Sequence, residues 1–419
     1  MVRMRPAILA AAMLGSAMSL AAPASAVGAT RPPSAGPSGL TATPFARAAQ
    51  PRPATAGTPA ITGDNATLSG VTCLSPDSCL AVGSFVATAE GGSTFGLSET
   101  WNGHNWGTIT VSGLTTKAAV TDALEVSCGA PGSCMLVGEH FSNPRLPVQF
   151  ADTLNGVWSP VKWNNPPGAK WSVLDDVKCV GTTFCMAIGT FSKTSGGGRP
   201  LAELWNGQSW QQLSAPSPAA LHGTDLSALW CESTSDCQAV GVGMNSAHHF
   251  ATFAEHWNGS GWKLGGIPNV RGRHNVLNDV ACFAPGDCIA VGFTQASGVL
   301  HPLVIRLHGG RWHIVATPAR RNAALLGISC PSATLCVGAG FQRGAPLTEK
   351  WNGSKWTVLT TARTGGSRPD DSLLHVACTS VSHCVAVGIR YNLRRRFSNH
   401  TLIEVWDGRT WHVQTSVNP

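Results

Sequence analysis

The chain is long, apolar and weakly charged: its 419 residues are 43% hydrophobic and 12% charged, with 47 Gly, 27 Pro and 15 Trp. This composition excludes a disordered chain, and the length exceeds that of one small core. Residues 1–61 carry five Arg and no acid, so the remaining 24 Lys and Arg face 22 Asp and Glu, a net charge of +2. A domain this close to neutral is not predicted to bind nucleic acid.

The first 61 residues read as an export signal followed by a tether. Arg3 and Arg5 precede an apolar run over 7–22, and Ala24-Ser25-Ala26 has the small residues of a cleavage site. We therefore predict a Sec-type signal peptide over 1–26 and secretion of the mature protein. Residues 27–61 are rich in Pro, Ala, Gly, Ser and Thr and are predicted to form a flexible linker. No second apolar stretch is long enough to predict a membrane span in the mature chain.

From residue 62 onward the sequence repeats seven times around paired cysteines. Every pair has the spacing C-x5-C, and successive first cysteines are 55, 51, 52, 51, 48 and 48 residues apart. The pairs are Cys73 and Cys79, Cys128 and Cys134, Cys179 and Cys185, Cys231 and Cys237, Cys282 and Cys288, Cys330 and Cys336, and Cys378 and Cys384. An aliphatic residue stands two before each first cysteine, and Gly stands four after each second one. Short apolar runs on both sides of a turn predict a β-hairpin.

A second hairpin follows in each repeat. Five repeats contain the frame L-x-E-x-W-N-G-x-x-W or a close variant with Phe or Asp-Gly, as in Leu97–Trp106. Asn-Gly and Asp-Gly are the dipeptides that tight hairpin turns prefer. The closing tryptophan is present in all seven repeats, at 106, 158, 210, 262, 312, 356 and 411.

Two hairpins in about 50 residues supply four strands, which is the content of one propeller blade. We therefore predict an all-β fold, a seven-bladed β-propeller of four-stranded antiparallel blades over residues 62–419. A parallel β-helix is the alternative, but its coils need fewer residues and no paired hairpins.

In an exported chain, cysteines at both ends of a five-residue turn are predicted to form local disulfides. A zinc site would need two pairs to meet, which pairs spread around a ring do not, and no C-x-x-C motif is present. No metal or cofactor is predicted.

Twelve of the 15 tryptophans belong to the repeated frame, so their predicted role is packing. The repeated acid receives the same structural interpretation; it is Glu99, Glu203, Glu255, Glu349, Glu404 and, in the second repeat, Asp152. Of the tryptophans outside the frame, Trp230 is predicted to pack. Trp163 and Trp171 flank a connecting loop and are candidates for ligand binding.

The motif C-x5-C-x-A-V-G followed by L-x-E-x-W-N-G-x-x-W resembles a repeat of secreted actinobacterial β-propeller proteins, and its layout is similar to that of Asp-box and Kelch-type propellers. The resemblance covers residues 62–419 and implies the propeller architecture. It implies no particular activity.

Function is predicted from the residues that depart from the repeat. The segment 390–400 holds Arg390, Tyr391, Arg394, Arg395, Arg396 and His400. Arginine forks bind carboxylate and phosphate groups, so these residues are the candidate contacts of an anionic ligand. We expect a monomeric, non-catalytic binding propeller with an extracellular carbohydrate, cell-wall polymer or protein as partner. The alternative is a glycan-directed hydrolase or lyase with its site at one mouth of the propeller.

Overall fold

The structure is a computed structural model that describes residues 63–87, 94–109, 120–143, 146–154, 158–194, 197–318, 321–362, 371–392 and 398–417. The predicted signal peptide (1–26) and linker (27–61) lie outside these residues. Within the described ranges, no helix has the length and apolar character needed to cross a membrane.

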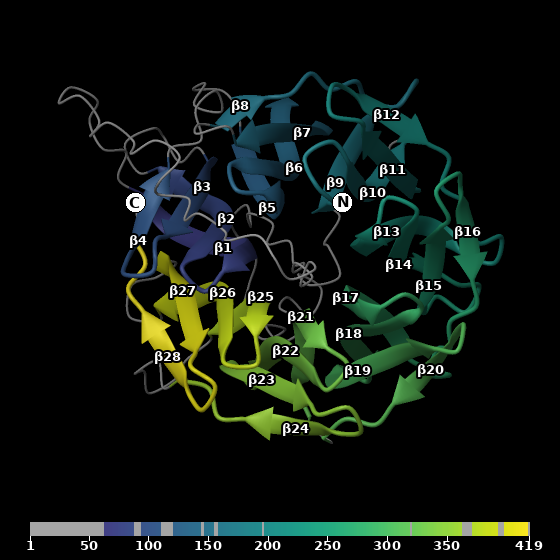
Figure 1. The fold of residues 1–419 in the computed structure, drawn as a ribbon. Coiled ribbons are helices and arrows are strands. Elements are labelled where there is room, and N and C mark those ends of the chain that lie inside the picture. Colours follow the sequence, from purple (N-terminus) through teal and green to yellow (C-terminus); the bar gives the residue numbers. More distant parts are fainter. Residues whose placement is uncertain are drawn as a thin grey trace.

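The described residues form seven four-stranded antiparallel sheets, each built from four consecutive strands. Figure 1 shows these sheets as blades around a central axis, with the first strand of each blade innermost and the fourth at the rim. The prediction of a β-propeller with four-stranded antiparallel blades is confirmed. Because each blade takes its strands from one repeat, no strand is exchanged where the ring closes.

The strands fall into four classes by their distance from the axis. The innermost are β1 (Gly63–Ser75), β5 (Val120–Ala130), β9 (Trp171–Cys179), β13 (His222–Ser233), β17 (His274–Ala284), β21 (Ala323–Ser332) and β25 (Ser372–Ser380). The second strands are β2 (Ser78–Ala87), β6 (Ser133–Asn143), β10 (Cys185–Ser192), β14 (Asp236–Met244), β18 (Asp287–Ala296), β22 (Leu335–Gln342) and β26 (His383–Asn392). The third strands are β3 (Thr94–Trp101), β7 (Leu146–Leu154), β11 (Arg199–Trp205), β15 (Phe250–Trp257), β19 (Val299–His308), β23 (Ala345–Trp351) and β27 (Ser398–Trp406). The outermost are β4 (Trp106–Ile109), β8 (Trp158–Pro160), β12 (Trp210–Leu213), β16 (Trp262–Gly265), β20 (Arg311–Val315), β24 (Trp356–Leu359) and β28 (Trp411–Gln414).

The hydrophobic core lies between neighbouring blades. Leu80 of blade 1 packs with Leu136 of blade 2, and Leu68 of blade 1 packs with Val387 and Ile403 of blade 7. A blade therefore buries its apolar faces only when both neighbours are present, so the ring is stabilised as a whole.

Every innermost strand contains a β-bulge, which explains the glycine four residues after each second cysteine. In blade 1 the register shifts between Leu68 and Gly70, where Leu68 pairs with Gly83 of β2. A Cβ atom on Gly83 would lie 1.9 Å from the carbonyl oxygen of Thr67. Similar approaches of 2.1, 2.2, 2.0, 2.0 and 2.0 Å occur at Gly189, Gly241, Gly292, Gly340 and Gly388. Only glycine fits where the bulged backbone crosses the second strand.

The predicted disulfides are all present, and each joins two cysteines six residues apart with a Cα–Cα distance of 3.8 to 4.0 Å. In each blade the bond links the innermost strand to the second strand. The bonded pairs are Cys73 with Cys79, Cys128 with Cys134, Cys179 with Cys185, Cys231 with Cys237, Cys282 with Cys288, Cys330 with Cys336, and Cys378 with Cys384. All 14 cysteines lie in described strands and none is free. Seven disulfides indicate an oxidising, extracellular environment.

In blades 1, 3, 4 and 6 the Asn-Gly turn of the second hairpin is held by its asparagine, and in blade 7 Asp407 does the same. Asn102 Oδ1 accepts the backbone N–H groups of His104 and Asn105 at 3.0 Å, and Gly103 takes a φ of 90°. The two tryptophans that flank the turn pack with ring centroids 5.7 Å apart in blade 1. Trp101 Nε1 then donates to the carbonyl of Pro76 in the disulfide turn at 3.1 Å, which ties the two turns of the blade together.

Because adjacent strands run antiparallel, the two kinds of loop gather on opposite sides of the disc. We call the side with the disulfide turns and the Asn-Gly turns the turn face. The loop face is the opposite side, where second strands connect to third strands and where one blade connects to the next.

Candidate functional site

Polar side chains from different blades meet at the axis of the ring. They occupy the position three residues before the first cysteine, which holds Gly70, Glu125, Asp176, Ala228, Asp279, Gly327 and His375. His375 Nδ1 lies 3.9 Å from Glu125 Oε1, and its Nε2 lies 4.0 Å from Asp279 Oδ2. Blades 7, 2 and 5 can meet only at the centre. We call Glu125, Asp176, Asp279 and His375 the axial cluster; each is 0% exposed.

The axial cluster satisfies backbone N–H groups near the bulges. Three of its side chains accept a hydrogen bond from the backbone of the following blade. The bonds are Leu229 N to Asp176 Oδ2 at 2.6 Å, Ile328 N to Asp279 Oδ2 at 2.7 Å, and Val71 N to His375 Nδ1 at 2.9 Å. In each case the following blade carries Ala or Gly at its own axial position. The small residue leaves room for the large one, so the blades interlock around the axis.

Burial decides the electrostatics of this cluster. Burial raises the pKa of Glu125 well above its usual range, and the nearby carboxylates of Asp176 and Asp279 raise it further. Glu125 therefore holds its proton more tightly than a solvent-exposed glutamate does. No group of three or more His, Cys, Asp or Glu among the described residues could hold a metal ion. Each member of the cluster is 0% exposed, and three of them link neighbouring blades through hydrogen bonds.

Sequence reasoning missed the axial cluster, although a signal was present. At the axial position the repeats differ in chemical kind, whereas the aliphatic residue and the cysteine that follow it recur. A position that varies inside a regular repeat therefore indicates a candidate site as well as a variable loop does.

The repeated glutamates of the third strands are buried between blades, in keeping with their predicted structural role. Glu99, Glu203, Glu255, Glu349 and Glu404 are 0, 2, 0, 0 and 0% exposed. Burial raises the pKa of Glu203 and Glu255 to about 8. These carboxyl groups keep their protons near neutral pH and do not face solvent. The side chain of Asp152, the acid of the second repeat, lies outside the described part of the chain.

Two of these glutamates accept hydrogen bonds from the chain that leaves the preceding blade. Ser416 Oγ donates to Glu99 Oε1 at 2.7 Å, and Ala362 N donates to Glu404 Oε2 at 3.3 Å. Burial raises the pKa of both to about 7, and these bonds oppose the rise.

We expect the protein to lose stability as the pH rises. Folded Glu255 keeps its proton up to a pKa of about 8, whereas an unfolded glutamate releases it near pH 4.3. Its contribution is therefore complete below about pH 4.3 and is lost as the pH rises through about 8, at up to about 1.4 kcal/mol per pH unit for each carboxyl group. Urea unfolding at pH 5, 7 and 9 measures this slope. Glu255→Gln should flatten it and should unfold at higher urea than the wild type at pH 9.

The matched control for this prediction is Glu232→Gln on the exposed surface, which should leave the slope unchanged. A wild-type protein that becomes more stable from pH 5 to pH 9 would contradict the prediction.

On the turn face, carboxylates are paired with histidines. Asp236 Oδ1 lies 3.0 Å from His256 Nε2, Asp287 Oδ1 lies 2.5 Å from His308 Nδ1, and Asp407 Oδ2 lies 2.9 Å from His412 Nε2. Each contact places an imidazole nitrogen within hydrogen-bond distance of a carboxylate oxygen.

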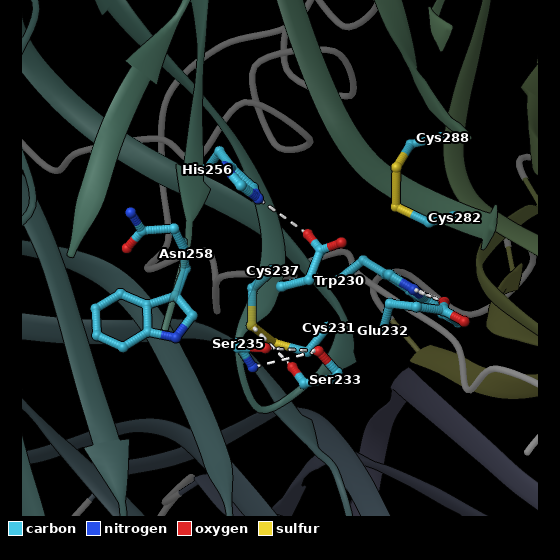
Figure 2. Close-up of polar contacts among 12 residues, drawn as sticks. Trp230, Cys231, Glu232, Ser233, Ser235, Cys237, His256, Asn258, Cys282 and Cys288 are labelled. Atoms are coloured by element: carbon cyan, nitrogen blue, oxygen red, sulfur yellow. Dashed lines mark hydrogen bonds and ion pairs between the residues drawn. A yellow bond between two sulfur atoms is a disulfide. The ribbon is translucent and has the colours of Figure 1, made fainter. Parts of the chain in front are cut away.

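Figure 2 shows the turn face at the junction of blades 4 and 5, where Trp230 and Glu232 border a crevice. Trp230 Nε1 donates to Glu232 Oε2 at 3.2 Å, and Lys178 Nζ lies 4.4 Å from the centroid of the Trp230 ring. Trp230 is 0% exposed and packs, as predicted. The space between the atoms that line the crevice is about 160 Å³ with open solvent included, and it leaves no room for a small molecule.

The loop face differs from the turn face in its charge. Among the side chains that the structure describes, every exposed charged one on the loop face is basic. These side chains are Lys162, Lys170, Lys193, Arg199, Arg271, Arg321 and Arg343. The exposed acids of the described chain, Asp77, Glu232 and Asp407, all lie on the turn face beside four exposed bases. Among the described side chains, the near-neutral net charge therefore hides a separation of exposed charge between the two faces.

Backbone hydrogen bonds link the loop face from blade 5 to blade 7. Asn322 N donates to Leu300 O, Arg343 N to Asn322 O, and Asp371 N to Gly344 O, each at 2.9 Å. Asn322 and Arg343 take φ values of 55° and 51°. Arg343 begins the two-residue turn that joins β22 to β23, a position where Asn or Gly is favoured. An arginine there costs stability relative to glycine or asparagine.

Three of the predicted ligand-binding residues meet at the loop-face end of blade 7. Arg390 and Tyr391 lie just before the loop-face end of β26, and Arg390 pairs with His400 of β27. Asp371 Oδ1 accepts Tyr391 N at 3.1 Å, and its Oδ2 lies 3.7 Å from Arg390 Nε. The buried Asp371 therefore fixes Arg390 and balances part of its charge. Arg394, Arg395 and Arg396 lie outside the described residues.

The two candidate tryptophans lie elsewhere. Trp163 packs edge-on against Trp210 with ring centroids 5.6 Å apart, and Trp171 begins β9 with 9% of its surface exposed. The structure does not bring either of them to the basic side chains of blades 5 to 7.

No protein-family model matches the chain, and a search of curated proteins gives no match. Solved structures with similar folds include YCF48 bound to a D1 peptide, with 15% identity, a TM-score of 0.51, and coverage of 88% of this chain and 99% of that one. The β-propeller domain of the Trilobed protease from Pyrococcus furiosus has 8% identity and a TM-score of 0.52, with 84% and 99% covered. The polysaccharide lyase Uly1 has 10% identity and a TM-score of 0.50, with 84% and 92% covered. These likenesses support the propeller fold.

Proposed function

We propose that this protein is a secreted, monomeric, non-catalytic binding protein whose loop face takes an acidic extracellular glycan, such as an acidic cell-wall polysaccharide. The observation that carries the proposal is the separation of charge: the exposed charged side chains described on the loop face are all basic. A surface of one sign attracts a polymer of the opposite sign and orients its approach. The disulfides and the leader-like segment 1–26 support an extracellular setting.

The proposed contacts run along blades 5 to 7. They include Arg321, Arg343 and Arg390, which lie on or next to the segments of the loop face that backbone hydrogen bonds connect from blade 5 to blade 7. Tyr391 and His400 adjoin Arg390. Arg394–Arg396 follow in the sequence and extend the proposed set. Trp163 and Trp171 are left out, because their contacts are with the packed interior.

A double charge reversal tests the loop face. Arg321→Glu with Arg343→Glu should weaken binding of an acidic polysaccharide roughly tenfold at low salt and reduce its salt dependence, because two attractive charges become repulsive. Binding is measured by fluorescence anisotropy with labelled polygalacturonate. Arg311→Glu with Lys355→Glu makes the same charge change on the turn face and should leave affinity nearly unchanged. Equal losses in both variants would show that the loop face is not the site.

A second substitution separates binding from stability. Arg343→Asn places a residue that tolerates positive φ in the turn, so the fold should be as stable as the wild type or more so while binding weakens. The triple reversal of Arg394, Arg395 and Arg396 to Glu tests the remaining proposed contacts in the same assay.

The catalytic alternative, a hydrolase or lyase, predicts turnover of the same polymers. Hydrolysis of a glycan by the usual route needs two carboxyl groups within reach of one bond. The part of the loop face that the structure describes has no exposed carboxylate. Release of reducing ends or of unsaturated sugars from the bound polymer would replace the binding proposal with the catalytic one.

A further inference from the structure

Two histidines lie against each other on the loop face where blade 4 meets blade 5. The rings of His249 and His274 have centroids 5.3 Å apart at an interplanar angle of 88°, and Phe250 packs on His274 at the same distance. Phe250 N donates to His274 Nδ1 at 3.1 Å, which places the proton of the neutral His274 ring on Nε2. The bond from Phe250 N to His274 Nδ1 therefore links blade 4 to blade 5, and a proton on Nδ1 would break it.

The loop that carries His249 has a fixed shape. Asn245 Oδ1 accepts the N–H groups of Ala247 and His249 at 3.0 Å, and His248 N donates to Asn245 O at 3.0 Å. His248 takes a φ of 58°, a conformation that costs stability for a residue other than glycine. The loop thus presents His248 and His249 in one preorganised arrangement.

The charged and titratable groups that adjoin the pair at the loop-face ends of its neighbouring strands are bases, whereas Asp225 of β13 and Glu255 of β15 lie farther along their strands. Arg271 and Arg273 lie on the connection that leads into β17, His222 begins β13, and His301 lies on β19. Among the described residues, no carboxylate lies within ion-pair distance of His249 or His274. On the turn face, by contrast, each of three histidines contacts an aspartate: His256, His308 and His412.

Resting on the proposed function, we propose that protonation of the His249–His274 pair strengthens the binding of an acidic polysaccharide at the junction of blades 4 and 5. Protonation of the pair adds positive charge beside Arg271 and Arg273. The protein then holds its ligand more tightly at acidic surfaces and releases it as the pH rises.

The physical reason is the coupling between proton and ligand. Burial, and then the charge of His249, lower the pKa of His274 from its ordinary value. Without ligand, a proton here is opposed by burial, by neighbouring bases and by the bond from Phe250. A bound carboxylate offsets that cost, so it favours protonation, and by linkage protonation favours the ligand to the same extent. Couplings of this kind commonly change affinity from about fivefold to more than a hundredfold.

The test measures anisotropy of labelled polygalacturonate with the full chain at pH 7.5, 6.5 and 5.5 and constant ionic strength. The carboxylates of the probe stay ionised over this range, so its own charge does not change. Wild-type affinity should rise about tenfold from pH 7.5 to 5.5. His249→Gln with His274→Gln should bind like the wild type at pH 7.5 and gain less than about twofold at pH 5.5, since a glutamine side chain keeps an acceptor for Phe250 N. His256→Gln with His412→Gln on the turn face should keep the tenfold gain.

Several outcomes overturn the inference. The inference is wrong if the double variant retains the tenfold gain, if the turn-face control loses it, or if the wild type binds equally at pH 5.5 and 7.5. Each of these results would leave the proposed function intact. Failure of the wild type to bind any acidic polysaccharide at either pH would overturn the proposed function itself. Should the double variant melt below the wild type at pH 7.5, His249→Gln alone, which leaves the Phe250–His274 bond in place, must still gain less affinity than the wild type between pH 7.5 and 5.5.

Discussion

Replacing Gly292 by alanine is expected to lower the free energy of unfolding by about 3 kcal/mol, at the upper end of the usual cost of overpacking. The new Cβ would lie 2.0 Å from the carbonyl oxygen of Val276 and 2.8 Å from the Cα of Leu277. Both obstacles are backbone atoms of the bulged strand β17, which cannot move aside as a side chain could. Relief requires the bulge to shift, and the hydrogen bond from Ile328 N to Asp279, which lies beyond the bulge, would shift with it.

Urea unfolding of the oxidised protein measures this loss. Gly266→Ala is the matched control, because a Cβ at Gly266 meets no atom within 4 Å. It should change stability by less than about 0.5 kcal/mol. Equal stability of the two variants would mean that the glycine is not required by the bulge.

Trp158→Ala is expected to cost about 3–5 kcal/mol, the range for removing a large buried side chain. Trp158 is 0% exposed and packs with Leu80 and Leu136 between blades 1 and 2. Its Nε1 also donates to Ser98 Oγ at 3.1 Å, so the substitution removes a hydrogen bond between the two blades.

The same substitution at Trp210 should cost only about 1–2 kcal/mol. Trp210 holds the equivalent place in the next repeat, but it is half-buried and packs against Trp163 and Trp205. The closing tryptophans therefore pack, as predicted, but are buried to different depths. Thermal melts of both variants, with polysaccharide binding as a second readout, check the prediction. A Trp158→Ala protein that melts like the wild type would contradict it.

The architecture of a single blade could be predicted from the sequence alone. The C-x5-C spacing, the Asn-Gly turn and the glycine after each second cysteine are local signals, because each depends on contacts within one hairpin or between adjacent strands. For that reason the four antiparallel strands and the disulfides, such as Cys73 with Cys79, could be predicted residue by residue. The burial of the repeated glutamates also followed from the repeat, since a residue that recurs in blade after blade usually meets the neighbouring blade.

The contacts between residues of different blades became visible only in the tertiary structure. Glu125, Asp279 and His375 are separated by 154 and 96 residues in sequence, and they meet because closure of the ring points all innermost strands at one axis. The separation of charge between the two faces was hidden in the same way: each exposed lysine or arginine is ordinary in its own repeat, and the alternation of strand direction assigns it to one face. His249 and His274 come from different repeats and touch only because blades 4 and 5 are neighbours. Local chemistry specifies each blade, whereas the candidate sites depend on how the blades are placed around the axis.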